Sequence, residues 1–229
     1  SDLVGFTQIT ESLESEDLTA ALNYYLDEMS AIALKYGATI DKYIGDAIMI
    51  FFGDPESQGI AEDAFRCVSM AVEMQKRLEE LTDKWAHFGL QEPFKMRIGI
   101  NTGFCTVGNF GSENRLDYTV IGAGVNMASR LESAAASGSI LLSFDTYNLV
   151  KDKISCRESE RINLKGISNP VRTYEVVEAE NTGPVITIKT QNSFLQEQLS
   201  GLTKQQIDEL SASLTNALDT LRAHVEISS

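Results

Sequence analysis

Residues 38–52 read ATIDKYIGDAIMIFF, and this stretch constrains how the rest of the chain can fold. Two short apolar, β-prone segments flank Gly45-Asp46, and a glycine between such segments is typical of a tight turn. The stretch therefore predicts a β-hairpin with its tip at Gly45-Asp46.

Amphipathic helices are predicted on both sides of this hairpin. Before it, apolar residues recur at alternating spacings of four and three over residues 18–36, and Gly37 is a suitable helix end. After it, Asp54-Pro55 closes the hairpin and a second apolar stripe runs over residues 61–81. Gln75 is a polar break in this second stripe.

Strands and one more helix continue the alternation toward residue 178. Strand-like segments with glycine punctuation occupy residues 96–100, 105–108 and 116–121, a helical pattern covers 123–136, and strands follow at 140–142 and 171–177. A mixed series of this kind predicts one α/β (α+β) sandwich over residues 1–178, in which helices cover a sheet.

Residues 179–229 are predicted to lie outside this domain. The cluster Asn181-Thr182-Gly183-Pro184 is typical of a linker, and a short β-prone VITIK segment follows it. Thr203 and Gln206 form a capping box for an apolar stripe over residues 202–225, which predicts a C-terminal amphipathic helix. Packing of this helix on its own domain is favoured over a role as a partner helix.

The composition restricts the classes of function. Of 229 residues, 43% are hydrophobic and 23% are charged, which is the balance of a soluble globular protein. The net charge of -14 comes from 19 Lys plus Arg against 33 Asp plus Glu, and so acidic a surface argues against binding nucleic acid or anionic lipid. Three scattered cysteines fit neither a disulfide framework nor a zinc site, and no P-loop string occurs.

The N-terminus suggests where the protein resides. The chain begins at Ser1 without a preceding strand or cap, so an N-terminal strand is expected to be missing. No apolar run approaches the roughly 18 residues of a membrane-spanning helix. The expected location is the cytoplasm, with tethering to the inner membrane through an upstream regulatory or membrane module as an alternative.

Two separated acids are candidates for binding a metal ion. The segment SDLVGFT places Asp2 at a strand end, then a glycine and a helix start near Thr7, whose free N–H groups suit phosphates. Asp46 follows Gly45 in the hairpin turn. Either acid alone is most simply a surface or turn residue, but two converging carboxylates with phosphate oxygens would hold Mg²⁺.

Lys42 is a candidate ligand-binding residue on the first strand of the hairpin. It has the same strand parity as Ile40 and Ile44, which predicts that it points toward a buried face. A lysine on such a face either snorkels to the sheet edge or serves a ligand.

Three more polar residues could contact a phosphorylated ligand. Asn126 and Arg130 are four apart on one predicted helix, so they can grip a ribose and a phosphate together or form an ordinary solvated face. Lys165 precedes Gly166 in a predicted loop, where an ammonium could reach a polyphosphate or simply lie at the surface.

A family resemblance connects these residues. The motifs SDLVGFT, KYIGDAIM, MRIGINTG, YTVIGAGVNMASRLES and INLKGI with PVRTYEV, in this order, resemble the catalytic domain of class III nucleotidyl cyclases over about residues 1–178. The resemblance implies a ferredoxin-like core, and the predicted C-terminal helix would extend it. The resemblance also implies a homodimer in which two domains pair head to tail and share each active site.

The resemblance also implies residue roles. Two Mg²⁺ or Mn²⁺ ions per active site would lie at Asp2, Leu3 and Asp46, where one activates the ribose hydroxyl and the other steadies the triphosphate. Asn126 would orient the ribose, and Arg130 would meet charge at the α-phosphate. Substrate binding would fall to the remaining residues of the motifs, which are Lys42, Thr119, Lys165, Gly5, Phe6 and Thr7.

The implied activity is that of an adenylate cyclase, which converts ATP into cyclic AMP and pyrophosphate. Lys42 as a donor with the Thr119 hydroxyl as an acceptor matches adenine, and this Lys/Thr pair resembles a bacterial-type subgroup. Phe104 departs from family members that carry an arginine there, so one phosphate contact is absent or supplied otherwise. The alternatives are a guanylate cyclase and a catalytically silent cyclase-like domain for nucleotide sensing or dimerisation.

Overall fold

The structure is a computed structural model that describes most of the first 177 residues. The described residues are 1–90, 92–112, 114–159, 161–162, 170–177, 185–189, 194–198, 211 and 215. Two compact units are present, Ser1–Val177 and Glu178–Ser229.

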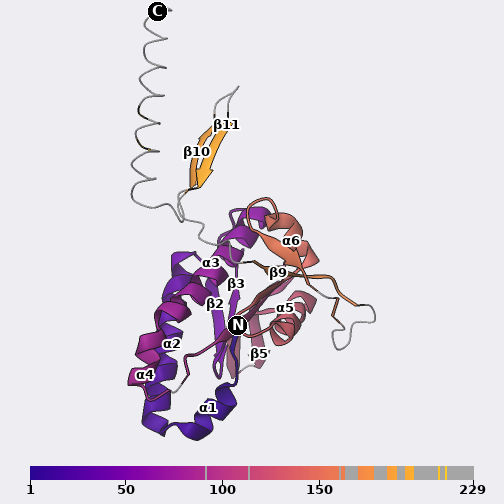
Figure 1. Ribbon diagram of the computed structural model, residues 1–229. Helices are drawn as coiled ribbons and strands as arrows, with labels where there is room; N and C mark the ends of the chain where they lie inside the picture. Colours follow the sequence, from indigo (N-terminus) through magenta and orange to yellow (C-terminus); the bar gives the residue numbers. More distant parts are fainter. Residues whose placement is uncertain are drawn as a thin grey trace, which may run out of the picture. The chain divides into compact units, whose positions relative to one another are not determined.

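A five-stranded sheet forms the centre of the first unit (Figure 1). Its strands, in spatial order, are β1 (Asp2–Leu3), β4 (Met96–Ile100), β7 (Ile140–Ser143), β9 (Thr173–Val176) and β8 (Cys156–Glu158). Strands β4 and β7 run parallel, and the other neighbours are antiparallel.

Two hairpins accompany this sheet. One joins β2 (Thr39–Ile44) to β3 (Ala47–Phe51), and the other joins β5 (Thr106–Ser112) to β6 (Arg115–Ile121). Ser1 and Ile48 exchange two backbone hydrogen bonds of 3.0 Å, which attach β3 to the start of β1. The predicted hairpin tip at Gly45-Asp46 is confirmed, and Gly45 has the positive φ of 65° that this turn requires.

Helices cover both faces of the sheet. Along β4, Met96, Ile98 and Ile100 belong to the main hydrophobic core, which also contains buried residues of α2 (Ser15–Lys35) and α3 (Ile60–Glu80). Helix α5 (Ala123–Ala134) packs on the other face, where Leu131 and Leu141 form a smaller core. Shorter helices complete the layers: α1 (Phe6–Ser12), α4 (Thr82–His87) and α6 (Phe144–Val150).

The predicted α/β sandwich is confirmed, and the polar break in the second stripe now has a reason. Gln75 is buried in α3, and its side-chain amide donates a hydrogen bond of 2.8 Å to the Met96 carbonyl. The short elements α4, α6 and β8 lack a periodic pattern long enough to predict them.

In the second unit, the VITIK segment is strand β10 (Val185–Lys189), paired with β11 (Phe194–Gln198). The predicted C-terminal helix falls almost wholly outside the described residues. Ser211 and Thr215 are helical, and the Thr215 hydroxyl donates to the Ser211 carbonyl at 2.8 Å. None of the helices in the described part of the chain is both long and apolar enough to cross a bilayer.

Candidate active site

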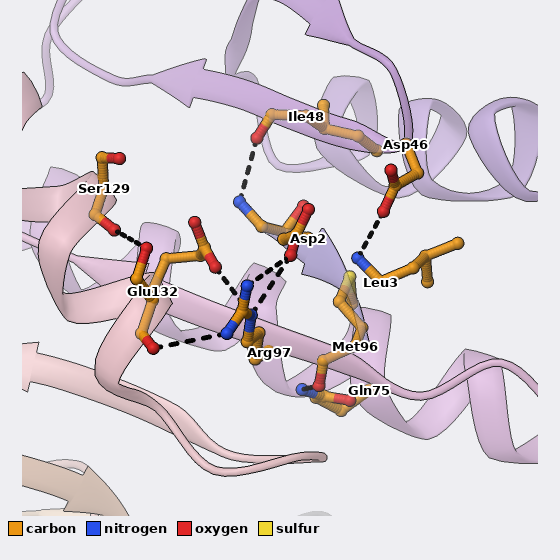
Figure 2. A network of polar contacts seen from close by, with 11 residues as sticks. Asp2, Leu3, Asp46, Ile48, Gln75, Met96, Arg97, Ser129 and Glu132 are labelled. Atoms are coloured by element: carbon orange, nitrogen blue, oxygen red, sulfur yellow. Dashed lines mark hydrogen bonds and ion pairs between the residues drawn. The ribbon is translucent and has the colours of Figure 1, made fainter. Parts of the chain in front are cut away.

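The two candidate metal-binding acids meet at the junction of β1 and the first hairpin. Asp2 opens β1, and Asp46 lies in the turn between β2 and β3. Because β3 is bonded to Ser1, the turn reaches β1, and Asp46 Oδ2 accepts a hydrogen bond of 2.9 Å from the Leu3 N–H (Figure 2). Asp2, Leu3 and Asp46 are therefore neighbours in the fold.

Burial and repulsion act together on Asp46. Burial raises the pKa of the Asp46 carboxyl, and the nearby Asp2 carboxylate raises it further. The Leu3 N–H acts in the opposite direction because it stabilises the ionised form. Two carboxylates held so close together repel each other, and a bound cation would reduce this repulsion.

Arg97 on β4 holds Asp2 in place. Its Nη2 and Nε atoms lie 2.7 Å and 3.2 Å from Asp2 Oδ2, and its Nε lies 2.8 Å from Glu132 Oε1 on α5 (Figure 2). Burial alone would lower the pKa of Arg97, but its contacts with Asp2 and Glu132 raise it. All the Arg97 contacts with Asp2 go to Oδ2, so the other oxygen, Oδ1, is not engaged by this arginine.

The sequence contained a signal for the position of Arg97. In MRIGI, Met96, Ile98 and Ile100 alternate with Arg97 and Gly99, so the arginine had to lie on the opposite face of β4. That face is the one that α5 covers, and Arg97 pairs directly with Asp2 in the β1–β4 ladder.

The donor set suits a hard divalent ion that also contacts a substrate. Among the described residues, no group of three or more His, Cys, Asp or Glu side chains could hold a metal ion. Mg²⁺ is usually bound by one or two carboxylates together with substrate phosphates, which is what Asp2 and Asp46 can offer. The residues present therefore fit Mg²⁺ or Mn²⁺ in the presence of a nucleotide.

The start of α1 lies directly after β1. Gln8 and Ile9 both donate to the Gly5 carbonyl, so the N–H groups of Phe6 and Thr7 precede the first helical hydrogen bonds. Gly5 has a φ of 72°, a conformation that favours glycine at this tight connection. Phe6 is half-buried against Phe94, whereas Thr7 is exposed.

Lys42 and Thr119 form a second cluster around a residue that the sequence did not single out. Thr119 is buried on β6, and its hydroxyl donates to Asp41 Oδ2 at 2.9 Å. The Val120 N–H donates to Asp41 Oδ1 at 3.0 Å, and Lys42 Nζ lies 3.3 Å from Asp41 Oδ2. Asp41 thus brings Lys42 and Thr119 together.

The predicted orientation of Lys42 is wrong because β2 contains a bulge. Ile40 pairs with Ile50 and Lys42 pairs with Met49, so Asp41 is an extra residue in the ladder. The bulge breaks the strand parity. The Lys42 side chain is 43% exposed and points away from the core.

Asn126 and Arg130 lie on α5, and Lys165 lies outside the described residues. Asn126 is exposed and Arg130 is half-buried, and neither side chain has a hydrogen bond or ion pair with another described residue. Gly99 allows α5 to pack closely on β4, because an added Cβ would overlap Ala128 O and Glu132 N. The exposed Phe104, in the loop after β4, provides no charge for a phosphate.

The structure therefore holds two separate groups of candidate residues. Asp2, Leu3 and Asp46 form one group with Arg97, and Lys42 and Thr119 form another with Asp41. Within the described ranges, no hydrogen bond or ion pair joins the acids to Lys42, Thr119, Asn126 or Arg130.

Comparison with known proteins identifies the class. The family described as "Adenylate and Guanylate cyclase catalytic domain" matches residues 1–178, so the chain belongs to this family of nucleotide cyclases. The predicted family and its fold are both confirmed.

Individual relatives include cyclases for both bases. The solved adenylyl cyclase CyaB from P. aeruginosa is 54% identical, with a TM-score of 0.76 over 78% of this chain and 91% of that chain. The solved guanylyl cyclase Cya2 is 40% identical, with a TM-score of 0.72 over 79% of this chain and 91% of that chain. Adenylate cyclase 1 of Rhizobium meliloti is 34% identical over 180 residues, which span 77% of this chain but only 26% of that relative.

Proposed function

We propose that this domain is an adenylate cyclase that converts ATP into cyclic AMP and pyrophosphate at sites shared within a homodimer. One observation carries the proposal: a carboxylate pair that suits a metal–nucleotide complex occurs with a Lys42–Thr119 pair that suits adenine. The 54% identity with the solved adenylyl cyclase CyaB supports ATP as the substrate.

The acid pair would hold two Mg²⁺ or Mn²⁺ ions together with the triphosphate. When bound, such ions favour ionisation of the ribose hydroxyl and offset the charge of the departing pyrophosphate. Asp2 and Asp46 are oriented in advance, because Arg97 holds the first and the Leu3 N–H holds the second. The N–H groups of Gly5, Phe6 and Thr7 would then donate hydrogen bonds to phosphate oxygens of the substrate.

The other group would bind the nucleoside. The Lys42 ammonium would donate to adenine N1, and the Thr119 oxygen would accept from the exocyclic amine. Asn126 would orient the ribose and Arg130 would meet the charge at the α-phosphate, because a guanidinium fork suits phosphate oxygens. Lys165 would contact the terminal phosphates.

The lack of hydrogen bonds and ion pairs between the two groups, among the described residues, supports a homodimer. We infer that a second copy of the chain, arranged head to tail, completes the site at the acids of the first. The residues that it supplies are Lys42, Thr119, Asn126, Arg130 and Lys165. A closed twofold assembly would create two such sites. The cytoplasmic location and the division into residues 1–178 and 179–229 stay predictions.

A product assay with both bases tests the proposed function. The purified protein with Mg²⁺ or Mn²⁺ should form cyclic AMP and pyrophosphate from ATP faster than it forms cyclic GMP from GTP. Asp2→Asn should abolish this activity, whereas Glu73→Gln, which changes an acid on α3 that pairs with Lys35, should preserve it.

Two results would contradict the proposal. A preference for GTP would support a guanylate cyclase, for which the 40% identity with Cya2 is the relevant observation. No product from either nucleotide with a folded dimer would support a catalytically silent domain.

A further inference from the structure

Asp41 is the one buried carboxylate that contacts both of the residues proposed to read the base, among the residues that the structure describes. We propose that Asp41 is a specificity-determining positioning residue, which fixes the Thr119 hydroxyl as a hydrogen-bond acceptor toward the base and thereby favours ATP over GTP. This inference rests on the proposed function, because it assumes that Lys42 and Thr119 face the base.

The Thr119 hydroxyl has only one hydrogen to share between Asp41 and a ligand. A hydroxyl has one hydrogen to donate and two lone pairs to accept with. The hydrogen of Thr119 is directed to Asp41 Oδ2 at 2.9 Å. Toward any ligand, the Thr119 oxygen is then left with lone pairs alone.

This polarity distinguishes the two purine bases. Adenine presents an exocyclic amine, which is a donor and matches an accepting oxygen. Guanine presents O6 at the corresponding position, and two acceptors that face each other leave both without a hydrogen bond. A Thr119 hydroxyl that was free to rotate could satisfy either base, so the discrimination depends on its partner.

The Asp41 side chain lies among hydrogen-bond donors. It is 0% exposed, and these donors are the Thr119 hydroxyl, the Val120 N–H and the Lys42 ammonium. A buried carboxylate is costly unless donors of this kind satisfy it. The Val120 N–H and the Lys42 ammonium can only donate, so the Asp41 oxygens act as acceptors toward both, and the Thr119 hydroxyl donates to the oxygen that Lys42 approaches.

Lys42 is held by the same oxygen. Its Nζ lies 3.3 Å from Asp41 Oδ2, which is also the acceptor for Thr119, while 43% of the lysine side chain stays exposed. An ammonium has three hydrogens, so Lys42 can contact Asp41 and still donate outward. One carboxylate oxygen therefore orients a donor and an acceptor side by side.

The backbone explains how a strand residue can reach this position. Asp41 is the extra residue of the β2 bulge, between the pairs Ile40–Ile50 and Lys42–Met49. A bulge redirects the side chain at its extra residue, and here the carboxylate crosses to β6. Because the Asp41 side chain is fully buried, it acts through Thr119 and Lys42 and does not touch the base itself.

Asp41→Asn is the direct test. The Val120 N–H would keep the amide oxygen of Asn on its side, so the amide nitrogen would take the place of Oδ2 and donate to Thr119. The Thr119 hydrogen would then point toward the base, which suits guanine O6. We expect the ratio of kcat/KM for ATP to that for GTP to fall by about tenfold or more.

Asp63→Asn is a matched control. Asp63 is also buried and also accepts from one hydroxyl, that of Ser57, and from one backbone N–H, that of Gln58. The same loss of charge at Asp63 should lower stability without changing the ATP/GTP ratio. If Asp41→Asn lowers both rates in parallel and leaves the ratio unchanged, Asp41 is merely structural and the inference is wrong.

Substitutions of Thr119 test the inference when Asp41→Asn does not fold. Thr119→Ser keeps a hydroxyl that donates to Asp41 and should preserve the ratio, whereas Thr119→Val should reduce it by about tenfold. Equal ratios for these two variants would overturn the inference.

Nucleotide binding separates this inference from the proposed function. Dissociation constants for non-cyclisable ATP and GTP analogues report the preference for ATP over GTP without turnover. They are measured for the wild type and for Asp41→Asn. A wild type that binds ATP more tightly but forms no cyclic AMP would contradict the proposed function alone. Binding that shows no shift toward GTP in Asp41→Asn would contradict the role of Asp41 whatever the activity.

Discussion

Asp46 and Lys42 lie four positions apart on one hairpin, yet their surroundings differ in kind. Asp46 faces a second acid, and burial and repulsion raise its pKa. Lys42 shares a fully buried carboxylate with Thr119, so charge and hydrogen bonds there are matched. The group suited to a metal thus keeps an unsatisfied charge, whereas the group suited to a base has its polarity fixed in advance.

Asp46→Asn should have the largest effect on activity. Removing one of the two carboxylates proposed to bind the metal is expected to lower cyclic AMP formation by about a thousandfold or more. The amide oxygen can still accept from the Leu3 N–H. Activity is measured at saturating Mn²⁺ and ATP.

The same variant should not lose stability. Because the folded protein raises the pKa of Asp46, its ionised form weakens folding as pH rises through that pKa, and a neutral amide avoids this loss. Thermal unfolding at neutral pH without metal should give a Tm equal to or above that of the wild type. A clearly lower Tm would show that the acid pair stabilises the fold, contrary to the comparison.

Gly99→Ala should have the next largest effect, because it moves α5 against β4. The added Cβ would overlap backbone atoms of Ala128 and Glu132, which cannot move without shifting the helix that carries Asn126 and Arg130. A displacement of this kind is expected to lower kcat by about a hundredfold. Overpacking should also lower the free energy of unfolding by about 2 kcal/mol.

Gly103→Ala is the matched control for this helix shift. Its added Cβ would meet Asn101 Nδ2 at 3.4 Å and Gly124 Cα at 3.9 Å, which are ordinary contacts. It should leave kcat within about threefold of the wild type. Equal losses in the two variants would mean that the packing of α5 on Gly99 is not what matters.

Arg97→Lys should have a moderate effect confined to the acid pair. Lysine keeps the charge but cannot contact Asp2 and Glu132 through one planar fork, so Asp2 becomes less well oriented. A loss of about tenfold in kcat/KM, with the ATP/GTP ratio unchanged, is expected. Arg157→Lys, at the Glu175 pair on the far edge of the sheet, should change neither quantity.

Glu175→Gln should have the smallest effect and lies outside both groups. The Ser139 hydroxyl and Arg157 lower the pKa of Glu175, so its ionised form stabilises the folded protein above the ordinary glutamate pKa. The substitution should lower the free energy of unfolding by about 1 kcal/mol at pH 7 and leave activity intact.

The difference in the free energy of unfolding between the wild type and Glu175→Gln should depend on pH. It should shrink as pH falls from 4.5, the ordinary value, through the lowered pKa of the folded state, because the glutamate is then protonated. Urea unfolding curves at a series of pH values measure it. A difference that persists under acid conditions would mean that packing, and not charge, is what Glu175 contributes.

The sequence predicted those parts of the molecule that local patterns determine. The hairpin turn at Gly45-Asp46 and the helix that ends before Gly37 depend on residues close together in the chain, and both are present. The meeting of Asp2 with Asp46 was expected from the family resemblance, and the fold brings it about through the Ser1–Ile48 bonds.

Long-range contacts and a bulge account for what the sequence did not predict. Alternation of side chains assumed a regular strand, so the bulge at Asp41 reversed the expected orientation of Lys42. The partner of Asp41 is Thr119, 78 positions away, and no periodic pattern in the sequence predicts such a contact. The position of Arg97 was predictable, because the alternation of side chains along β4 shows which face the arginine occupies once the strand is known.

Mixing two inactive variants is the most direct test of the claim that separate residue groups of two protomers form one site. Asp46→Ala and Arg130→Ala homodimers should each be inactive, because every site lacks one essential group. After subunit exchange in an equal mixture, half of the dimers are mixed and each has one intact site, so about a quarter of the wild-type activity should return. No recovery, with exchange demonstrated by labelled subunits, would contradict a site shared between protomers.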